Sequence, residues 1–381
     1  MTLSTENLHF IETTKALQEA ADIFSKATCV GVDLEADSMF HFREKVCLIQ
    51  MAAGDYVAVI DPLAIEDMSP IVPVFEDPSI RKIFHGSDYD IRSLNRDFDI
   101  AIQNLFDTEL ASRFLGVRET GLSSVMKTRF GVEMDKTYQK KDWSKRPLTP
   151  GMIAYGAGDV LYLPKLAEIL DSELAACERT TWVEEECLLL SGVRHQINGE
   201  APLFTRIKGA GKLDRRSLAV LEELLRLRLL LAEKKDRPPF KVFSNTSLIT
   251  LSKERPLSMG RLKSSGALSP RQTSTHGSQV LEAIQTGVEI TEEDLPKYPR
   301  KKRPHFHSDV PKRVDTLKAW RDALALELKL DPPILLNKAL MTTLAVANPS
   351  SMEELCAIDG LRKWQIAALG QGIVDTLHPA A

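Results

Sequence analysis

Two carboxylates lie two residues apart in a short apolar run near the N-terminus. Residues 30–37 have the composition of a β-strand, on which Asp33 and Glu35 project from the same face, about 7 Å apart. A buried strand tolerates two acids on one face only when a cation lies between them. Carboxylate oxygens are the ligands that Mg²⁺ and Mn²⁺ prefer. The pair therefore predicts the first part of a site for two divalent metal ions.

A third acid follows a second predicted strand. Residues 80–85 are strand-like, residues 86–88 form a turn, and a helical pattern follows. Ligands of open sheets gather where the strands end, which is where Asp90 is expected. Asp88 competes for the same role, but its place in the turn favours capping of the helix. We therefore choose Asp90 as the third candidate ligand.

Tyr155 and Asp159 are four residues apart in a segment predicted to be one long helix, residues 151–177. That spacing puts both side chains on one face of the helix, one turn apart. Taken alone, a residue of either type is more often a cap, a solvated charge or part of the packing. Four acids and a tyrosine in this order, near strand ends and helix starts, favour a common site instead.

The elements around these residues predict an α/β fold. Residues 7–28 have the pattern of a strand and an amphipathic helix, and residues 46–51 and 56–61 that of a hairpin beside the acidic strand. Further along, strand-like residues 80–85 and 104–107 are separated by a helix. Strands that alternate with helices pair in parallel, so we expect a mixed sheet flanked by helices.

The second half of the chain predicts helices. A helical run at residues 218–235 is followed by Pro238-Pro239-Phe240, and a similar Pro-Pro-apolar phrase recurs at residues 332–334. The separation of roughly 90 residues suggests a duplicated helical domain. His305 and His307 suggest a metal, but we assign them to a linker rich in Pro, Lys and Arg. The predicted domains are residues 1–200, 204–290 and 312–381, with the linker at residues 291–311.

Composition and charge limit the class of protein. A chain of 381 residues that is 43% hydrophobic is expected to form two or three domains. No apolar run reaches the roughly 20 residues that span a membrane, and the N-terminus does not resemble a secretory signal. Five scattered cysteines suggest reduced thiols. We therefore expect a cytoplasmic protein without membrane contact, while the oligomeric state stays open, with a monomer favoured.

The charge is divided unevenly along the chain. Residues 1–200 carry a net charge of −13 and residues 201–381 a net charge of +9, which together give the −4 of the whole chain. An acidic first half and a basic second half suggest metal-binding carboxylates in one part and contact with a polyanion in the other.

Three phrases of the sequence resemble the exonuclease motifs of the DEDD superfamily, in its tyrosine-bearing branch. They are Asp33-x-Glu35, His85-Gly86-x-x-x-Asp90-x-x-x-Leu94 and Tyr155-x-x-x-Asp159. Further phrases are similar to those of the ribonuclease D family, namely Leu48-Ile49-Gln50, Ile60-Asp61-Pro62-Leu63 and Asp142-Trp143-x-x-Arg146-Pro147-Leu148. The two C-terminal modules resemble HRDC domains, which are small helical units that bind nucleic acid. The resemblance implies a sheet like that of ribonuclease H, followed by two small all-α domains.

The resemblance also implies an activity. Four acids are expected to hold two Mg²⁺ or Mn²⁺ ions, while Tyr155 orients the attacking water. The acids are Asp33, Glu35, Asp90 and Asp159. The chain is then a metal-dependent 3′–5′ exoribonuclease that removes 3′-terminal nucleotides from stable RNA precursors such as tRNA, releasing nucleoside 5′-monophosphates. Two alternatives stay open, a 3′–5′ exonuclease acting on DNA and a non-catalytic RNA-binding adaptor, although the complete set of acids argues against the adaptor.

Further side chains are predicted to hold the terminal nucleotides of an RNA 3′ end. They lie close in sequence to the elements that carry the acids, and stacking of an aromatic side chain on a base contributes roughly 1–3 kcal/mol. For the aromatic members, packing in the core or in a loop is an equally good interpretation. The predicted nucleic-acid-binding residues are Phe42, Gln50, His85, Trp143 and Arg146.

Overall fold

The computed structural model describes residues 7–196, 199, 201–299 and 307–379. The chain divides into two compact units. The first consists of the N-terminal residues up to Ala36, the stretch Val46–His195 and the C-terminal module. The second consists of the loop Asp37–Lys45 and the described residues from Gln196 up to 299. Residues 300–306, which form the centre of the predicted basic linker and include His305, lie outside the described residues.

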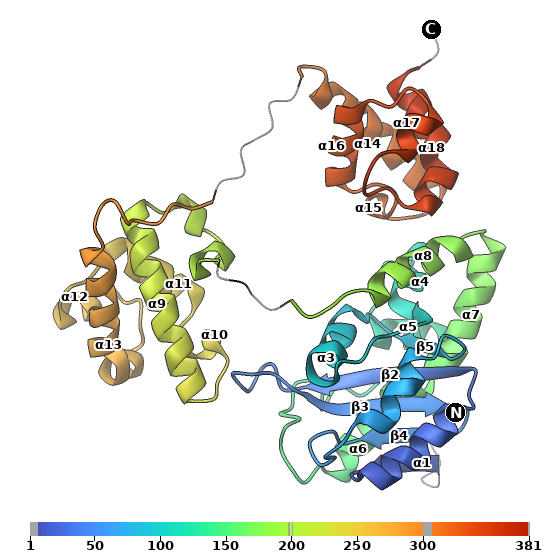
Figure 1. The fold of residues 1–381 in the computed structure, drawn as a ribbon, viewed down its shortest axis with the longest axis horizontal. Helices are drawn as coiled ribbons and strands as arrows, with labels where there is room; N and C mark the ends of the chain where they lie inside the picture. Colours follow the sequence, from blue (N-terminus) through green and yellow to red (C-terminus); the bar gives the residue numbers. More distant parts are fainter. Residues whose placement is uncertain (1–6, 197–198, 200, 300–306, 380–381) are drawn as a thin grey trace. The chain divides into compact units, whose positions relative to one another are not determined.

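A six-stranded sheet forms the centre of the first unit, in the order β1-β4-β3-β2-β5-β6 (Figure 1). Strands β2, β3 and β4 are antiparallel neighbours, as predicted from the hairpin. The other pairs, β1 with β4, β2 with β5 and β5 with β6, are parallel, so the predicted mixed sheet is confirmed. The strands are β1 (Leu8–Ile11), β2 (Cys29–Ala36), β3 (Val46–Ala53), β4 (Tyr56–Ile60), β5 (Arg81–Phe84) and β6 (Leu105–Asp107).

Helices flank this sheet. None of the described helices is long and apolar enough to cross a membrane. The helices of this part are α1 (Thr14–Phe24), α2 (Val72–Glu76), α3 (Asp88–Phe98), α4 (Thr108–Phe114), α5 (Leu122–Phe130), α6 (Pro150–Leu161), α7 (Leu163–Ala176) and α8 (Thr180–Ser191).

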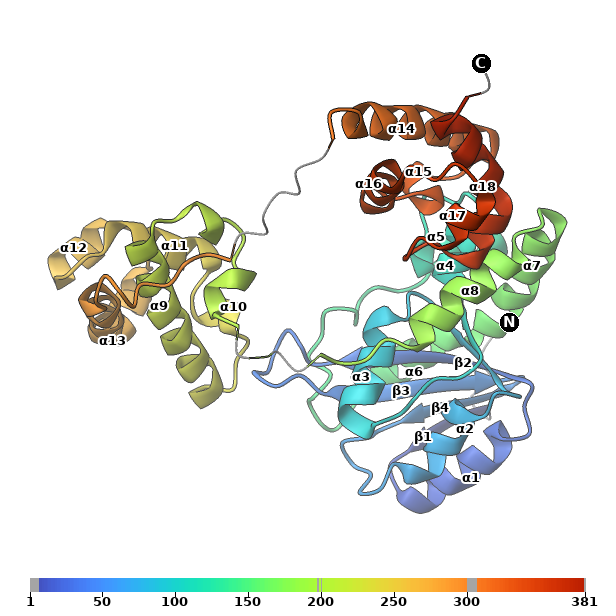
Figure 2. The same ribbon diagram turned by 45° about the horizontal axis from the view of Figure 1, so that its top comes forward.

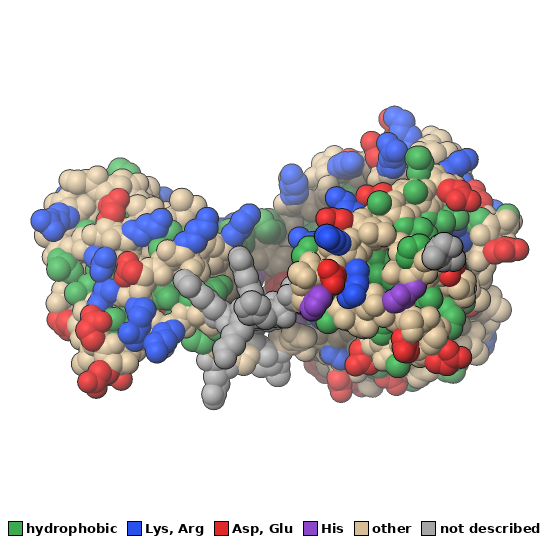
Figure 3. Space-filling view, turned by 90° about the horizontal axis from the view of Figure 1, so that it is seen from above, with side chains coloured by type: hydrophobic (Ala, Val, Ile, Leu, Met, Phe, Trp, Pro, Cys, Tyr) green, Lys and Arg blue, Asp and Glu red, His purple; other side chains and the backbone are tan. Residues whose placement is uncertain are grey.

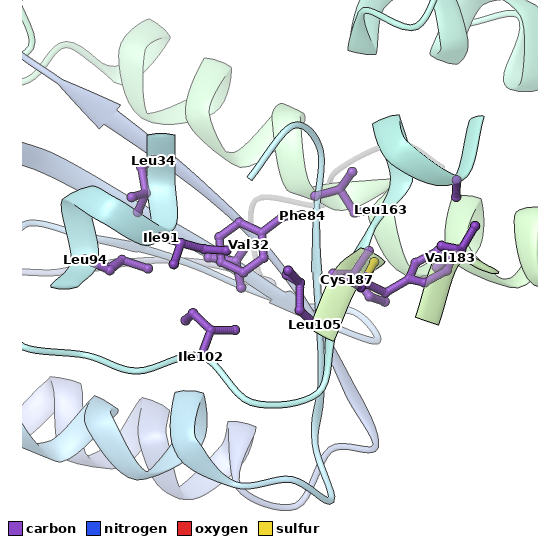
Figure 4. Packing of buried hydrophobic residues seen from close by; sticks show 14 of the residues in the cluster. Val32, Leu34, Phe84, Ile91, Leu94, Ile102, Leu105, Leu163, Val183 and Cys187 are labelled. Atoms are coloured by element: carbon purple, nitrogen blue, oxygen red, sulfur yellow. The ribbon is translucent and has the colours of Figure 1, made fainter. Parts of the chain in front are cut away.

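The central strand β2 separates an apolar face from an acidic one. Val32 is fully buried and lies with Ile91 and Leu94 of α3 in the core (Figure 4). Along β2, Asp33 and Glu35 alternate with Val32 and Leu34 and therefore project from the opposite face of the strand. The alternation of the sequence thus sets the direction of both acids.

The predicted helix over residues 151–177 is in fact two helices. Helix α6 ends at Leu161 and α7 begins at Leu163, because Pro164 has no N–H to donate and its ring would clash with the carbonyl of Val160. At this break α6 and α7 lie directly on β2. A Cβ atom on Gly31 would lie 3.0 Å from the oxygen of Val160, so only glycine allows so close an approach.

Asp88 does not cap α3, which corrects a second prediction. It is the first residue of the helix, and the N-cap, Ser87, makes no capping hydrogen bond with its side chain. The Asp88 carboxylate instead pairs with Arg92 one turn later, with a distance of 2.9 Å from Oδ2 to Nε of the arginine. The guanidinium lowers the pKa of Asp88, so this acid stays charged on the surface.

Among the described residues after α8, the α-helices form two copies of a five-helix module. The loop Asp37–Lys45 belongs to the same unit as the first copy. Figure 3 shows Lys and Arg side chains on the viewed face of this unit. The first copy comprises α9 (Arg215–Lys234), α10 (Pro239–Val242), α11 (Asn245–Glu254), α12 (Met259–Ser264) and α13 (Pro270–Glu289). The second comprises α14 (Val310–Glu327), α15 (Pro332–Leu335), α16 (Lys338–Ala347), α17 (Met352–Cys356) and α18 (Lys363–Leu377).

Equivalent internal bonds confirm the duplication. Arg228 of α9 donates to the carbonyl of Phe243, and Arg321 of α14 donates to that of Leu336, in both cases 15 residues further on. The second copy is therefore offset from the first by 93 positions. Both arginines are 8% exposed, and bonding to a carbonyl satisfies a buried charge in each module.

The second copy packs against the sheet domain within the first unit. Helix α18 lies against α8 (Figure 2), where the indoles of Trp182 and Trp364 stack with ring centroids 4.5 Å apart. Glu185 of α8 accepts hydrogen bonds from the backbone N–H groups of Lys363 and Trp364, at 2.8 and 2.9 Å. A carboxylate at the first N–H groups of a helix satisfies donors that have no partner inside the helix.

Gly116 is predicted to be essential for this packing. It has a φ of 81°, and a Cβ atom there would lie 2.2 Å from the backbone oxygen of Lys329 in the second copy. Gly131 also has a positive φ, of 66°, but faces open space. We expect Gly131→Ala to cost about 1–2 kcal/mol of stability and Gly116→Ala clearly more, with faster hydrogen exchange in α14 and α18. Equal exchange in the two variants would contradict a close contact at Gly116.

Candidate active site

One cavity of about 350 Å³ collects most of the predicted catalytic residues. Three of the four acids, His85 and Tyr155 line it, together with the start of α5 and residues of the 134–139 segment. The acids on the wall are Asp33, Glu35 and Asp159. Asp90 is close enough to raise the pKa of Glu35, and Asp33 raises the pKa of Asp90 in turn. The fold therefore brings together acids that are distant in sequence.

Helix α6 brings Tyr155 and Asp159 to the acidic face of β2. Tyr155 hydrogen-bonds through its hydroxyl to the Asp159 carboxylate, which confirms that the two side chains share a helix face. Gly156 lies between them and packs on β3, where an added Cβ would come 3.0 Å from Nε2 of Gln50. The small residues of this segment, which weaken an isolated helix, allow the helix to approach the sheet closely.

The ring of Tyr155 is held between two other aromatic rings. The rings of Tyr138 and Trp143 each lie with their centroids 5.9 Å from that of Tyr155. Both belong to the segment that precedes α6 in the sequence. Contact on two sides fixes the rotamer of Tyr155, so its hydroxyl has a defined position at the edge of the cavity.

Asp107 organises the turn before the helix that carries Asp90, and the sequence reasoning missed it. Its carboxylate accepts hydrogen bonds from the N–H groups of Gly86 and Ser87, at 3.0 and 2.7 Å, and from the hydroxyl of Ser87 at 2.8 Å. It also caps α4, as its position just before that helix could have indicated. One buried carboxylate thus joins the ends of β5 and β6.

The four acids resist ionisation in the absence of a cation. Burial raises the pKa of Asp33 to about 7 and that of Asp159 to about 8, the latter with help from the charge of Asp33. Burial, followed by the charges of Asp33, Asp159 and Asp90, raises the pKa of Glu35 to about 9. The pKa of Asp90 is also raised, by burial and then by Asp33 and Asp107. Such a cluster is stable as four carboxylates only beside positive charge.

The donor set fits divalent metal ions. It consists of hard carboxylate oxygens, the ligands of Mg²⁺ and Mn²⁺, and it lacks the thiolates that softer metals favour. Within the described part of the chain, no three acid, histidine or cysteine side chains already surround one point closely enough to hold an ion.

Folding stability of the metal-free protein is predicted to fall as pH rises. Acids with raised pKa values bind protons more tightly in the folded state than in the unfolded state, where carboxyl pKa values lie near 4. This contribution is present below pH 4 and is lost as pH rises through about 7 to 9. We expect the Tm in chelator to fall between pH 6 and pH 9 and to recover with Mg²⁺ or Mn²⁺. A rising metal-free Tm over that interval would oppose this result.

The structure corrects several of the predicted nucleotide contacts. Gln50 is fully buried and Trp143 is 1% exposed, so neither can stack on or bond to a nucleotide as predicted. Gln50 pairs with Asp33 across the two strands and lies beneath α6. Arg146 is bound to the buried carboxylate of Asp61, at 2.5 and 2.6 Å, and compensates that charge.

The remaining predicted contacts, His85 and Phe42, differ in their surroundings. His85 lines the acidic cavity, while its Nδ1 bonds to the hydroxyl of Thr108 at 2.9 Å. Phe42 lies in the Asp37–Lys45 loop and packs against the core of the second unit. Lys136 and Gln139 line the cavity as well, but the sequence reasoning missed them because their segment has no periodic pattern.

Comparisons with known proteins agree with this site. The family profile described as 3′-5′ exonuclease matches residues 8–175, and that of the HRDC domain matches residues 217–284 and 311–377. The ribonuclease D of Haemophilus influenzae is 30% identical over 288 residues, which cover 74% of this chain and 71% of the relative. That of Escherichia coli is 30% identical over 292 residues, 76% and 78% of the two chains.

Solved structures resemble most of this chain. One is the crystal structure of Escherichia coli RNase D, described as an exoribonuclease involved in structured RNA processing. The match covers 97% of this chain and 98% of the Escherichia coli chain. Its TM-score is 0.74 at 25% identity. The catalytic core of RRP6 from Trypanosoma brucei covers 76% of this chain with 83% of its own, with a TM-score of 0.66 at 27% identity. With its acidic cavity and two HRDC modules, this chain belongs to the ribonuclease D family of 3′–5′ exoribonucleases.

Proposed function

We propose that this exoribonuclease trims the 3′ ends of stable RNA precursors, tRNA precursors among them, and releases nucleoside 5′-monophosphates with the help of two divalent ions. The cavity that unites Asp33, Glu35 and Asp159 with Tyr155 carries this proposal. Similarity to the ribonuclease D proteins, one of which is described as acting in structured RNA processing, supports RNA as the polymer.

The acids have one role in this proposal, which is to hold cations. Asp90 and Asp159 are buried, Asp33 and Glu35 are half-buried, and all four have raised pKa values, so they would gain from divalent ions and would give up their protons to bind them. Two bound divalent ions would supply the charge that makes water nucleophilic at neutral pH and that stabilises the departing 3′-oxygen. The ligands are Asp33, Glu35, Asp90 and Asp159.

Tyr155 acts through hydrogen bonds, donating to Asp159 and accepting from the water, rather than as a base. Burial and then the charge of Asp159 raise the pKa of its hydroxyl above the ordinary value near 10. The phenol therefore keeps its proton at neutral pH. A neutral hydroxyl fixed by two rings and by Asp159 can orient the attacking water through a hydrogen bond.

A comparison of RNA and DNA substrates tests this function. We expect a 5′-labelled tRNA precursor with a 3′ extension to shorten from its 3′ end with Mg²⁺ or Mn²⁺ and to stay intact in chelator. DNA of the same sequence is expected to react much more slowly. Nucleoside 5′-monophosphates identified by chromatography would support the proposal. Equal rates on both polymers, or nucleoside 3′-monophosphates as products, would overturn it.

A further inference from the structure

A groove lies between the sheet domain and the second helical module, both of which belong to the first unit. It consists of a cavity of about 610 Å³ and an adjoining cavity of about 230 Å³ that shares Arg113 and Ile334 with it. One wall is the end of α4 with the segment that leads to α5. The other wall is the end of α14 with α15. We call this feature the module groove.

The two walls are held together by buried contacts. The guanidinium of Arg179, 9% exposed, donates to the carbonyl of Phe114 on one wall and to that of Leu328 on the other, at 2.7 and 2.8 Å. The stacked rings of Trp182, in the sheet domain, and Trp364, in the second module, add a further contact between these two parts. A buried charge shared between both walls makes separation unfavourable, so the module groove is a fixed part of the first unit.

The module groove is positively charged. Arg113, Arg118 and Lys329 line it with exposed side chains, and within the described residues none of the three forms an ion pair. Asp331 contributes one carboxylate to the larger cavity. Unpaired cations gathered from both walls favour an anionic polymer, and guanidinium groups bind phosphate through two parallel hydrogen bonds.

The module groove and the acidic cavity adjoin the same short segment of the chain. Thr120 lines the groove and its neighbour Gly121 lines the cavity, and consecutive Cα atoms lie about 3.8 Å apart. The hydroxyl of Thr120 bonds to Glu109 of α4 at 3.1 Å, which fixes this segment. A strand that leaves the acidic cavity past Gly121 has only this segment to cross before it reaches the groove.

An exposed apolar side chain adds to the charged groups. Leu326 is 81% exposed and lines the groove. An unpaired base offers an apolar face for such a side chain, whereas a double helix keeps its bases stacked. This feature favours a single strand as the occupant.

We infer that the module groove binds the single-stranded RNA that precedes the 3′-terminal nucleotides, with Arg113, Arg118 and Lys329 on its phosphates. The inference rests on the proposed function, because that function supplies the 3′ end in the acidic cavity. It assigns to the sheet domain and the second module a joint role in binding the substrate. The benefit should appear only for RNA long enough to leave the cavity.

Binding of a 20-nucleotide RNA to the full chain, and hydrolysis of RNAs of two lengths, test this inference. Anisotropy of a 5′-labelled 20-nucleotide RNA is measured in chelator, where no hydrolysis occurs, for the unmodified chain and for Arg113→Gln/Arg118→Gln. We expect Kd to rise about tenfold, and the slope of log K against log salt to fall by about 1.4, since each single-strand phosphate contact contributes about 0.7. With Mg²⁺, the ratio of kcat/KM for the 20-mer to that for a trinucleotide should fall about tenfold.

Two further variants complete the experiment. Lys329→Gln removes a cation from the opposite wall and should also weaken binding of the 20-mer. Lys15→Gln/Lys26→Gln changes the net charge by the same amount as the double arginine variant but on α1 and its C-terminal flank, and should leave Kd unchanged. An unchanged Kd and slope in Arg113→Gln/Arg118→Gln, or equal losses in the α1 control, would overturn the inference. If the unmodified chain fails to hydrolyse RNA, the proposed function fails, while the binding data still test the groove.

Discussion

Replacing Asp33 by Asn is expected to reduce RNA hydrolysis by roughly a thousandfold or more, because charge stabilisation by bound cations contributes several kcal/mol to such reactions. Asp33 faces the cavity from the centre of β2, and its charge raises the pKa values of Glu35, Asp90 and Asp159. An amide there removes both a ligand oxygen and the charge that attracts the ions. The measurement is the initial rate of 3′ shortening with Mg²⁺ or Mn²⁺.

The same substitution separates a catalytic role from a structural one. Loss of one acid relieves repulsion, so Asp33→Asn should raise the Tm in chelator at pH 8 and flatten its dependence on pH. Asp55→Asn, in the exposed turn after β3, is the matched control and should alter neither the rate nor the Tm appreciably. A variant that loses activity together with stability in chelator would instead point to a structural role for Asp33.

The second large effect is expected for Tyr155→Phe. This change removes one hydroxyl and leaves the ring between Tyr138 and Trp143, so the fold should be preserved. Loss of a group that orients water should lower kcat by roughly a hundredfold. KM for RNA and the affinity for Mn²⁺ should stay close to those of the unmodified chain, because the phenol is not a ligand.

A matched variant controls for the loss of a phenol. Tyr56→Phe removes a hydroxyl from β4, where the ring stacks on His9 at 4.5 Å, and should keep full activity. If Tyr155→Phe retained kcat, or lost Mn²⁺ affinity as strongly as Asp33→Asn, the role given to Tyr155 would be wrong. The pair thus distinguishes orientation of water from metal binding.

Local periodicity explains which parts of the site were predictable. The alternation of β2 sets the direction of Asp33 and Glu35, and a separation of four residues on a helix sets that of Tyr155 and Asp159. Both rules depend only on neighbours in the sequence. Asp90 was predictable from the order of strand, turn and helix, since a parallel strand brings its carboxyl end to the site.

Contacts that depend on tertiary packing were not predictable in the same way. Gln50 and Trp143 are residue types that suit nucleotide binding. In the fold, however, Gly156 packs on Gln50 and Tyr155 packs on Trp143, and no local sequence pattern indicates this packing. Pro164 causes the break at Tyr162. The prediction of a single helix followed the helical periodicity on both sides of this proline and did not take the proline into account. The packing of α18 on α8 depends on Glu185. Glu185 lies in a run of three glutamates, which in the sequence is indistinguishable from the solvent-exposed face of a helix.

The central claim is that the four acids meet around divalent cations, and binding of Mn²⁺ tests it most directly. Free Mn²⁺ is measured by electron paramagnetic resonance during titration of the full chain at pH 7.5, in the presence of adenosine 5′-monophosphate. Saturation at two ions per chain, with loss of this binding in Asp33→Asn and Asp159→Asn but not in Asp55→Asn, is the predicted result. No saturable binding, or binding that survives both substitutions, would contradict the account.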